Sequence, residues 1–163
     1  FFLKERFRDI LEIGKSDKTI IQDRSICEGV HVFAKNNHNQ GTISDLDFET
    51  YMDLFEQMLS MTREPDLMIY LRASIEHLVR NIQKRGREYE QTMQLDYLKG
   101  LNKQYEEFIN NNYKGRVLII DVNNLDYEHR PEDFRFITDK IDQIIYGLFP
   151  LNEKRPAESP SGF

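Results

Sequence analysis

The sequence contains one cysteine, no tryptophan and no long apolar run. Because Cys27 has no second cysteine to pair with, an internal disulfide is excluded, and so is a zinc site built on cysteines. The apolar runs are short, as at residues 117–120, whereas a membrane-spanning helix needs about 20 apolar residues. No secretory signal pattern opens the chain. These absences predict a cytoplasmic protein that does not enter a membrane.

Basic residues are also in the minority. The chain has 22 Lys and Arg against 28 Asp and Glu, a formal net charge of −6. This balance argues against a nucleic-acid partner, because binding a phosphate backbone needs an extended basic face. One segment reverses the balance, where four basic residues surround a glycine: Arg80, Lys84, Arg85, Gly86 and Arg87.

The guanidinium group of arginine binds phosphate oxygens in pairs, so this arginine cluster predicts a site for a small phosphorylated ligand. The alternative interpretation is a solvated helix end. Basic side chains there complement the helix dipole, and Gly86 would cap the helix.

A chain of 163 residues can form one domain with a core but not two ordinary domains. It begins without methionine, and Leu3, Phe7 and Ile10 already repeat at helical spacing. We therefore interpret the sequence as the carboxyl-terminal part of a longer protein. The prediction is one partial domain over residues 1–150 and a loose tail over residues 151–163, which contain two prolines and two serines.

Apolar periodicity predicts strands that alternate with helices. Continuous apolar runs predict strands at residues 19–22, 67–71 and 117–121. Helical spacing predicts helices after each strand, over residues 25–34, 44–61, 74–85, 95–110 and 134–148, with a polar loop at residues 35–42. Uninterrupted apolar strands between helices are typical of an α/β fold, a parallel sheet with helices on both faces in three layers.

Polar residues follow two of the predicted strands, at the edge where such sheets bind ligands. Asp23 and Arg24 come after the first strand, and Asp121 and Asn123 come after the third. A carboxylate such as Asp23 can bind Mg²⁺ through water, and Arg24 can reach a phosphate or a hydroxyl group. The alternative is a helix cap beside a surface arginine.

The tripeptide at residues 14–16, Gly-Lys-Ser, is not a phosphate-binding loop. Such a loop needs a glycine five residues earlier, where this chain has Asp9, and it must connect a strand to a helix. Here the tripeptide connects a helix to a predicted strand, so we interpret it as a turn.

Taken together, these features resemble the deoxynucleoside kinase family, in particular its bacterial deoxyadenosine/deoxyguanosine kinase branch. The resemblance covers about residues 3–148. It is carried by the order and spacing of several stretches: residues 23–25, 32–34, 65–71, 85–90, 95–98 and 121–123.

The resemblance implies a P-loop kinase-like fold that transfers the γ-phosphoryl group of ATP, with Mg²⁺, to the 5′-hydroxyl of a deoxynucleoside, a purine one by preference. Arg24 would contact the reacting 5′ end, and Asp23 would lie near the Mg²⁺ ion. Arg85 and Arg87 would belong to a lid that closes over the ATP phosphates, where charge counts most in the transition state.

The remaining implied roles concern the two nucleosides. Arg6 would lie near the edge of the substrate base, Phe33 would stack on that base, and Glu90 would bind the sugar 3′-hydroxyl. Asp121 and Asn123 would border the adenine of ATP.

Two departures from the family pattern matter. The phosphate loop and the general-base carboxylate of the family are absent from these residues, so we expect the 163-residue fragment alone to be inactive. Gly29 stands where several relatives carry an aspartate that reads the base, which leaves the base preference open.

The resemblance also implies a homodimer. The predicted helix over residues 44–61 carries a main apolar stripe, and Leu46 and Leu54 lie outside that stripe. A second apolar edge of this kind would be covered by a second copy of the chain.

Two other functions remain open at this point. One is a nucleoside monophosphate kinase of the thymidylate kinase type, which would need additional arginines for its acceptor phosphate. The other is a non-catalytic nucleotide-binding or assembly module, which the missing phosphate loop favours for these residues by themselves.

Overall fold

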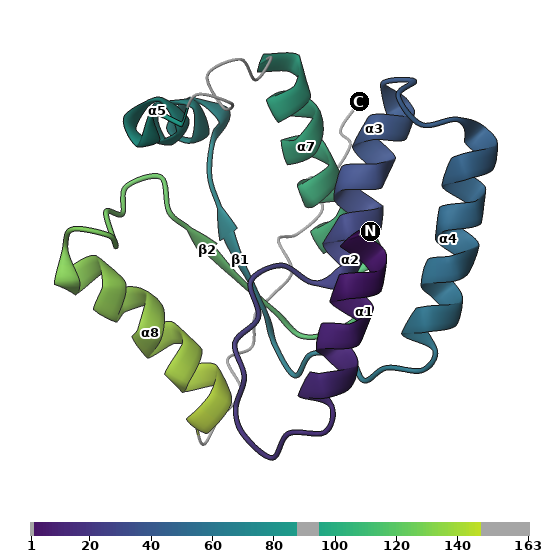
Figure 1. The fold of residues 1–163 in the computed structure, drawn as a ribbon. Coiled ribbons are helices and arrows are strands. Elements are labelled where there is room, and N and C mark those ends of the chain that lie inside the picture. The colour runs from purple at the N-terminus through teal and green to yellow at the C-terminus, as the bar shows by residue number, and fades with distance from the viewer. Residues whose placement is uncertain (1, 88–94, 148–163) are drawn as a thin grey trace, which may run out of the picture.

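The computed structural model describes residues 2–87 and 95–147. Its elements follow in the order α1 (Phe2–Ile13), α2 (Ile26–Glu28), η1 (Gly29–Ala34), α3 (Lys35–Asn39), α4 (Asp45–Leu59), β1 (Met68–Arg72), α5 (Ile75–Arg85), α7 (Leu95–Glu107), η2 (Phe108–Asn112), β2 (Val117–Asp121) and α8 (Pro131–Tyr146) (Figure 1). The two η segments are π-helical turns, and α2, η1 and α3 form one continuous helical run.

The two strands pair in parallel, with Met68 opposite Val117 and Arg72 opposite Asp121. On one face of the sheet, Leu118 and Ile120 pack against Ile137 of α8 and Leu78 of α5. The opposite face carries Met68, Tyr70, Val117 and Ile119, which pack against η1, α7 and η2. Helices therefore cover both faces, and the predicted α/β class with a parallel sheet in three layers is confirmed.

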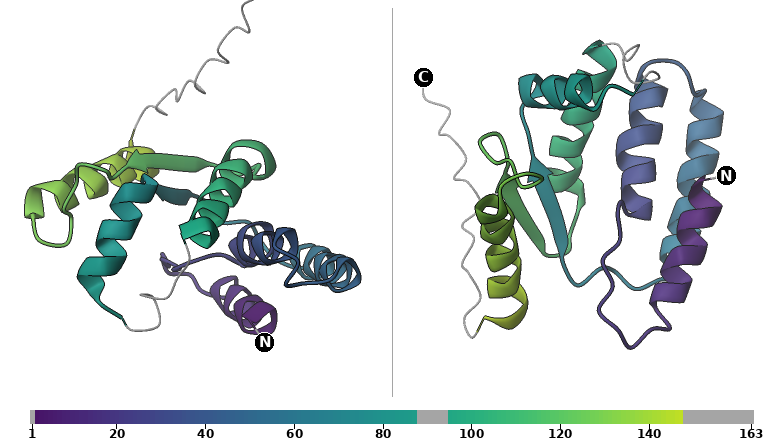
Figure 2. Two further views of the ribbon diagram at one scale, coloured as in Figure 1. Left: turned by 90° about the horizontal axis from the view of Figure 1, so that it is seen from above. Right: turned by 60° about the vertical axis from the view of Figure 1, so that its left-hand side comes forward.

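A further cluster lies on the far side of the molecule from α8. Leu3 of α1, Ile26 of α2, Val30 of η1 and Phe55 of α4 pack together. Figure 2 shows α1 and α4 as the elements most distant from α8, with the helical run α2–α3 between them and the sheet. This run is therefore the wall that separates the sheet from the outer helices.

Short-range signals decide where several helices begin and end. Ser44 and Ser74 are the N-caps of α4 and α5, and each side chain accepts a hydrogen bond from the backbone N–H three residues later. Gly86 ends α5 with φ of 66°, in the left-handed region that favours glycine. The helix starts at residues 44 and 74 and the Gly86 cap, all predicted from the sequence, are confirmed.

Two local predictions were wrong. Residues 19–22 form no strand, and the Ile21 side chain is 91% exposed. Within the described residues the sheet consists of β1 and β2 alone, and Ile20 and Ile21 line a cavity together with Ile69 and Leu71 of β1, so the segment has no strand to pair with.

The predicted polar loop at residues 35–42 is instead helical as far as Asn39. Asn36 is buried, and a Cβ added to Gly100 of α7 would lie 2.2 Å from its Oδ1 atom. The close approach of α7 thus buries a polar residue that the sequence pattern placed in a loop.

No helix in the described ranges 2–87 and 95–147 is long and apolar enough to cross a membrane. The predicted tail over residues 151–163 lies outside the described residues.

Candidate active site

The carboxyl ends of the two strands face a cavity of about 2760 Å³. Its wall brings together residues that are far apart in the sequence, from the segment before α2, from η1, from the end of α5 and from the loop after β2. Six of the predicted site residues line it: Asp23, Arg24, Phe33, Arg85, Arg87 and Asn123. Glu90 lies outside the described residues.

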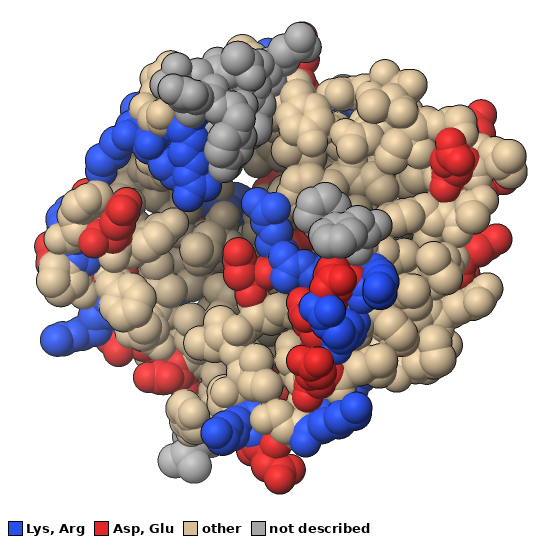
Figure 3. All heavy atoms as spheres, viewed as in Figure 1, with Lys and Arg blue, Asp and Glu red and all other residues tan. Residues whose placement is uncertain are grey.

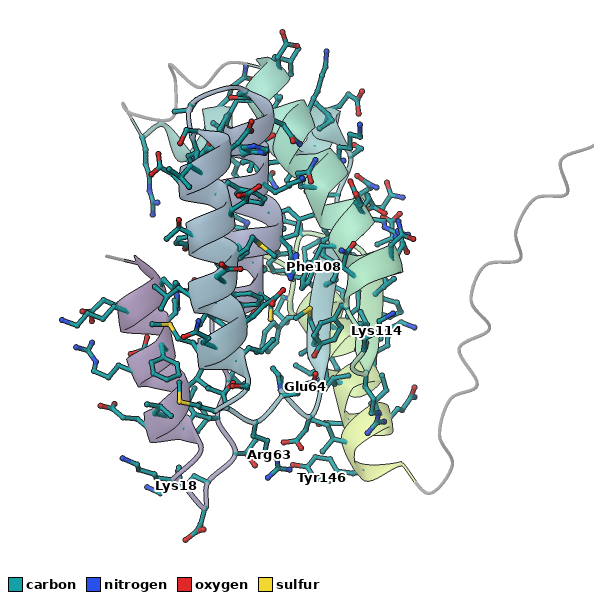
Figure 4. The ribbon with its side chains drawn as sticks, turned by 90° about the vertical axis from the view of Figure 1, so that its right-hand side faces the viewer. Lys18, Arg63, Glu64, Phe108, Lys114 and Tyr146 are labelled. Atoms are coloured by element: carbon teal, nitrogen blue, oxygen red, sulfur yellow. The ribbon has the colours of Figure 1, made fainter. Side chains whose placement is uncertain are left out.

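The cavity also extends toward the amino ends of the strands. Lys18, Arg63 and Tyr146 line it there and lie at the lower end of the molecule in Figure 4. Phe108 lies deep between the helices in the same view and is only 3% exposed. These six predicted residues thus occupy one end of a longer cavity, the end at which parallel sheets bind their ligands.

The segment at residues 23–25 is held from two sides. Arg6 Nη1 donates to the backbone carbonyl of Asp23 at 2.9 Å. Ser25 is the N-cap of α2 and forms a reciprocal capping box with Glu28, in which Ser25 N–H donates to Glu28 Oε2 at 2.5 Å. Arg6 does not line the cavity but binds the carbonyl of Asp23, which does, and its predicted place near the base edge stays a prediction.

Arg24 lies between these two contacts with φ of 64°. Its guanidinium carbon is 5.0 Å from the centroid of the Phe33 ring, a cation–π arrangement. The structure thus places the predicted 5′-end arginine directly beside the ring predicted to stack on the base.

The Phe33 ring is the first of three aromatic rings in contact. It meets the Tyr105 ring edge-on at 6.3 Å, and Tyr105 stacks on Tyr70 at 5.9 Å with an interplanar angle of 10°. The Tyr105 hydroxyl donates to Glu28 Oε1 at 3.1 Å. Burial, and then the Glu28 carboxylate, raise the pKa of Tyr105 above its usual range, so this hydroxyl stays protonated as a donor.

The basic cluster lies on the rim of the cavity. Arg85 is the last residue of α5, Arg87 follows Gly86, and both side chains are exposed. Figure 3 shows Lys and Arg side chains gathered over α5, beside a hollow in this face. The helix-end and ligand-site interpretations are therefore compatible, because the capped end of α5 is itself part of the cavity wall.

Asn123 and Asp121 connect the two strand ends. The Asn123 side-chain oxygen accepts from Ser74 N–H at 2.8 Å, and its carbonyl accepts from His77 Nδ1 at 3.1 Å. Asp121 Oδ1 accepts from Asn123 N–H at 2.9 Å, and Asp121 does not line the cavity. These contacts fix the start of α5, and an adenine-bordering role for the two residues stays a prediction.

Sequence reasoning missed Tyr105 and Glu28. The capping-box spacing from Ser25 to Glu28 was legible, because a serine followed three residues later by glutamate is a local signal. The Tyr105–Glu28 hydrogen bond joins residues 77 positions apart, so no pattern in the sequence indicates it.

Among the described residues, no three or more His, Cys, Asp or Glu side chains are grouped closely enough to hold a metal ion. Mg²⁺, however, keeps several waters and takes one or two protein carboxylates together with substrate phosphate oxygens. Asp23 is exposed and lines the cavity. A single carboxylate in this position fits an ion that arrives with a nucleotide.

A family model for the deoxynucleoside kinases matches residues 1–146. The chain belongs to this family. The predicted deoxynucleoside kinase function and phosphotransferase class are thereby confirmed, together with the resemblance on which they rested.

Curated relatives agree with this assignment. The chain is 32% identical to a Bacillus subtilis deoxyadenosine/deoxycytidine kinase over 90% of its own length and 68% of the relative's. It is 36% identical to a Dictyostelium discoideum deoxyadenosine kinase over 67% of its length and 44% of that relative's. The chain therefore spans about half to two thirds of the length of these relatives.

A solved structure of deoxyadenosine kinase from M. mycoides with bound dATP superposes with a TM-score of 0.71. Its sequence is 31% identical, and the match covers 86% of this chain and 70% of that one. The fold assigned from the two strands and their helices is thus the fold of this kinase.

Proposed function

We propose that the protein to which these residues belong transfers the γ-phosphoryl group of ATP to the 5′-hydroxyl of a deoxynucleoside, with a purine base preferred. The observation that carries the proposal is the cavity, whose wall unites six predicted site residues at the carboxyl ends of the strands. The names of the relatives, which include deoxyadenosine and deoxyguanosine kinases, support the purine preference.

The proposed roles follow from position and charge. Arg85 and Arg87 stabilise the transferring phosphoryl group, because a loose transition state spreads charge over its oxygens and catalysis depends on positioned cations. Arg24 contacts the reacting 5′ end, and Phe33, 5.0 Å from its guanidinium group, stacks on the base. Glu90, which is outside the described residues, keeps its proposed contact with the sugar 3′-hydroxyl.

Mg²⁺ would supply charge neutralisation between the ATP phosphates. Asp23 is the residue of this chain that we propose to hold it, through water, because its exposed carboxylate lines the same cavity as the arginines.

The surroundings of Gly29 leave the base preference open. A Cβ added there would meet Tyr51 Oη at 3.9 Å, an ordinary contact, so the position has room that glycine leaves unused. The base edge near Gly29 therefore meets no carboxylate from this position, which is the physical reason to test all four deoxynucleosides side by side.

The experiment is a phosphotransfer assay on the product of the complete gene, with ATP, Mg²⁺ and each deoxynucleoside or deoxynucleoside 5′-monophosphate as acceptor. We expect monophosphate products, fastest from deoxyadenosine or deoxyguanosine. Turnover of monophosphates alone would replace the proposal with a nucleoside monophosphate kinase. Nucleotide binding without any turnover would replace it with a non-catalytic module. The 163 residues expressed alone should show no turnover, since they contain no phosphate-loop motif.

We also propose that the protein is a homodimer that acts in the cytoplasm. The solitary Cys27 suits a reducing compartment. On α4, Leu46 and Leu54 are 72% and 45% exposed, and Met61 just beyond the helix is 61% exposed. An apolar edge of this size on one helix is suited to a self-complementary two-fold contact.

A further inference from the structure

Arg24 has an unusual backbone conformation. Its φ of 64° is the only positive value at a non-glycine residue in the described ranges. The left-handed region costs an ordinary L residue about 1 kcal/mol or more, so the surrounding contacts must hold it there. In this conformation the guanidinium group of Arg24, which we propose to contact the reacting 5′ end, lies over the Phe33 ring.

The contacts that hold Arg24 are on its two neighbours. Arg6 Nη1 binds the carbonyl of Asp23 on one side, and Glu28 Oε2 accepts from Ser25 N–H on the other. These two hydrogen bonds fix the peptide groups before and after Arg24. The carboxylate of Glu28 is therefore one of the two anchors of the conformation.

Glu28 is itself oriented by Tyr105. Its second oxygen, Oε1, accepts from the Tyr105 hydroxyl at 3.1 Å, so each carboxylate oxygen has one partner. Tyr105 is half-buried on α7, and its ring stacks on Tyr70 of β1. The Tyr105 ring is thus held by the sheet and by α7, independently of its hydrogen bond to Glu28.

The same tyrosine also contacts the other side of the site. Its ring meets Phe33 edge-on, and Phe33 lies under the Arg24 guanidinium group. One side chain thereby supports both the backbone of Arg24, through Glu28, and the ring over which the Arg24 side chain lies.

We propose that Tyr105 is a positioning residue for phosphoryl transfer, which holds Arg24 in its left-handed conformation through the hydrogen bond to Glu28. This inference rests on the proposed kinase function. Tyr105 does not contact the reacting groups. Its removal should therefore lower the rate of the chemical step and leave ATP binding at the α5 end of the cavity unchanged.

The test is Tyr105→Phe in the product of the complete gene, which keeps the ring contacts and removes only the hydroxyl donor. We expect kcat for the deoxynucleoside to fall about tenfold, the factor that corresponds to one hydrogen bond, with the KM for ATP within about twofold of wild type. Near-normal kcat would overturn the proposal.

The matched control is Tyr113→Phe. The Tyr113 hydroxyl is also buried, and within the described part of the chain it has no hydrogen-bond partner. Burial raises its pKa to about 12, so this tyrosine too stays protonated. The control should keep wild-type kcat, and an equal loss in both variants would indicate a general packing effect and overturn the proposal.

A double-mutant cycle on kcat tests whether Tyr105 acts through Glu28. If Tyr105 acts through Glu28, Tyr105→Phe combined with Glu28→Ala should be no slower than Glu28→Ala alone. Fully additive losses in kcat would contradict the proposed route.

A crystal structure of Tyr105→Phe provides a readout that needs no activity. We expect the Glu28 carboxylate to move from Ser25 N–H and the φ of Arg24 to leave the left-handed region. An unchanged Arg24 would overturn the inference even if the kinase function stands. If the wild-type protein turned over no deoxynucleoside, the proposed function would be refuted. The crystal structure of Tyr105→Phe would still test whether Tyr105 holds the backbone of Arg24.

Discussion

Arg72 and Glu106 form a two-point ion pair that joins the carboxyl end of β1 to α7. Arg72 Nε donates to Glu106 Oε1 at 2.9 Å, and Arg72 Nη2 donates to Oε2 at 2.8 Å. Tyr70 adds a third hydrogen bond to Oε1 at 3.0 Å. The pair therefore fixes α7 one residue from Tyr105, on the same turn of the helix that supports the candidate site.

We predict that Glu106→Gln lowers the free energy of unfolding by about 1 kcal/mol, measured by urea denaturation. The side chains of Arg72 and Glu106 are 36% and 33% exposed, so solvent screening keeps the loss well below that of a buried pair. The control is Glu107→Gln, an exposed neighbour on the same helix, which should change stability by less than about 0.5 kcal/mol. Equal effects of the two substitutions would contradict the prediction.

Arg85→Ala and Arg87→Ala should each lower kcat about a hundredfold in the complete protein. A loss of this size is typical when one preorganised electrostatic donor is removed from an active site. Lysine at either position should restore little, because an ammonium group cannot bind two phosphate oxygens in the planar geometry of a guanidinium group. Arg8→Ala serves as control, since Arg8 is exposed on α1 and does not line the cavity. Near-normal turnover of Arg87→Ala would contradict the phosphate-site interpretation and favour the solvated helix end.

Cys27 should react slowly with iodoacetamide. Burial, the largest influence, raises the pKa of its thiol from 9.0 to about 11. The reactive thiolate is thus about a hundredfold scarcer at pH 8 in the folded chain than in urea-unfolded chain. Alkylation followed by mass spectrometry reports this site alone, because Cys27 is the only cysteine.

The pH dependence of this alkylation shows whether folding raises or lowers the pKa of the Cys27 thiol. The folded-state rate should keep rising as the pH approaches about 11, whereas the unfolded rate should level off near pH 9. Since the folded pKa is the higher one, the neutral thiol contributes stability below pH 9, and this contribution decreases as the pH rises toward 11. Equal folded and unfolded rates at pH 8 would show that the thiol is not shielded.

Charged substitutions at both Leu46 and Leu54 should convert the complete protein into a folded monomer. The two side chains are exposed on α4, so their replacement by glutamate removes apolar contact area from a dimer interface without disturbing the core. Sedimentation measures the mass, and circular dichroism verifies the fold. The control is Asp53→Glu together with Glu56→Asp, which changes two exposed side chains of α4 and keeps the charge of the helix, and it should leave the dimer intact. A wild-type protein that sediments as a monomer at micromolar concentration would end the dimer proposal.

The sequence predicted those parts of the fold that depend on residues close together in the chain. The caps at Ser44, Ser74 and Gly86 act within four residues, so the sequence indicated them correctly. The strands β1 and β2 were predicted because their apolar runs are continuous. Residues 19–22 carry a similar run, yet form no strand, because a strand also requires a partner for its backbone groups and no local pattern supplies one.

The site divides in the same way. The residue types of the arginine cluster, such as Arg85, indicated a phosphate site by themselves, whereas the stacking role of Phe33 came only from the resemblance to the family, and both roles stay predictions. The left-handed backbone of Arg24 and the link from Tyr105 through Glu28 were not, because they depend on α7 packing against a segment 77 residues away. The sequence by itself determined the family, the local caps and the chemistry available to the site. Only the tertiary structure decided which of those groups meet, because contacts between distant segments are set by the packing of whole helices against the sheet.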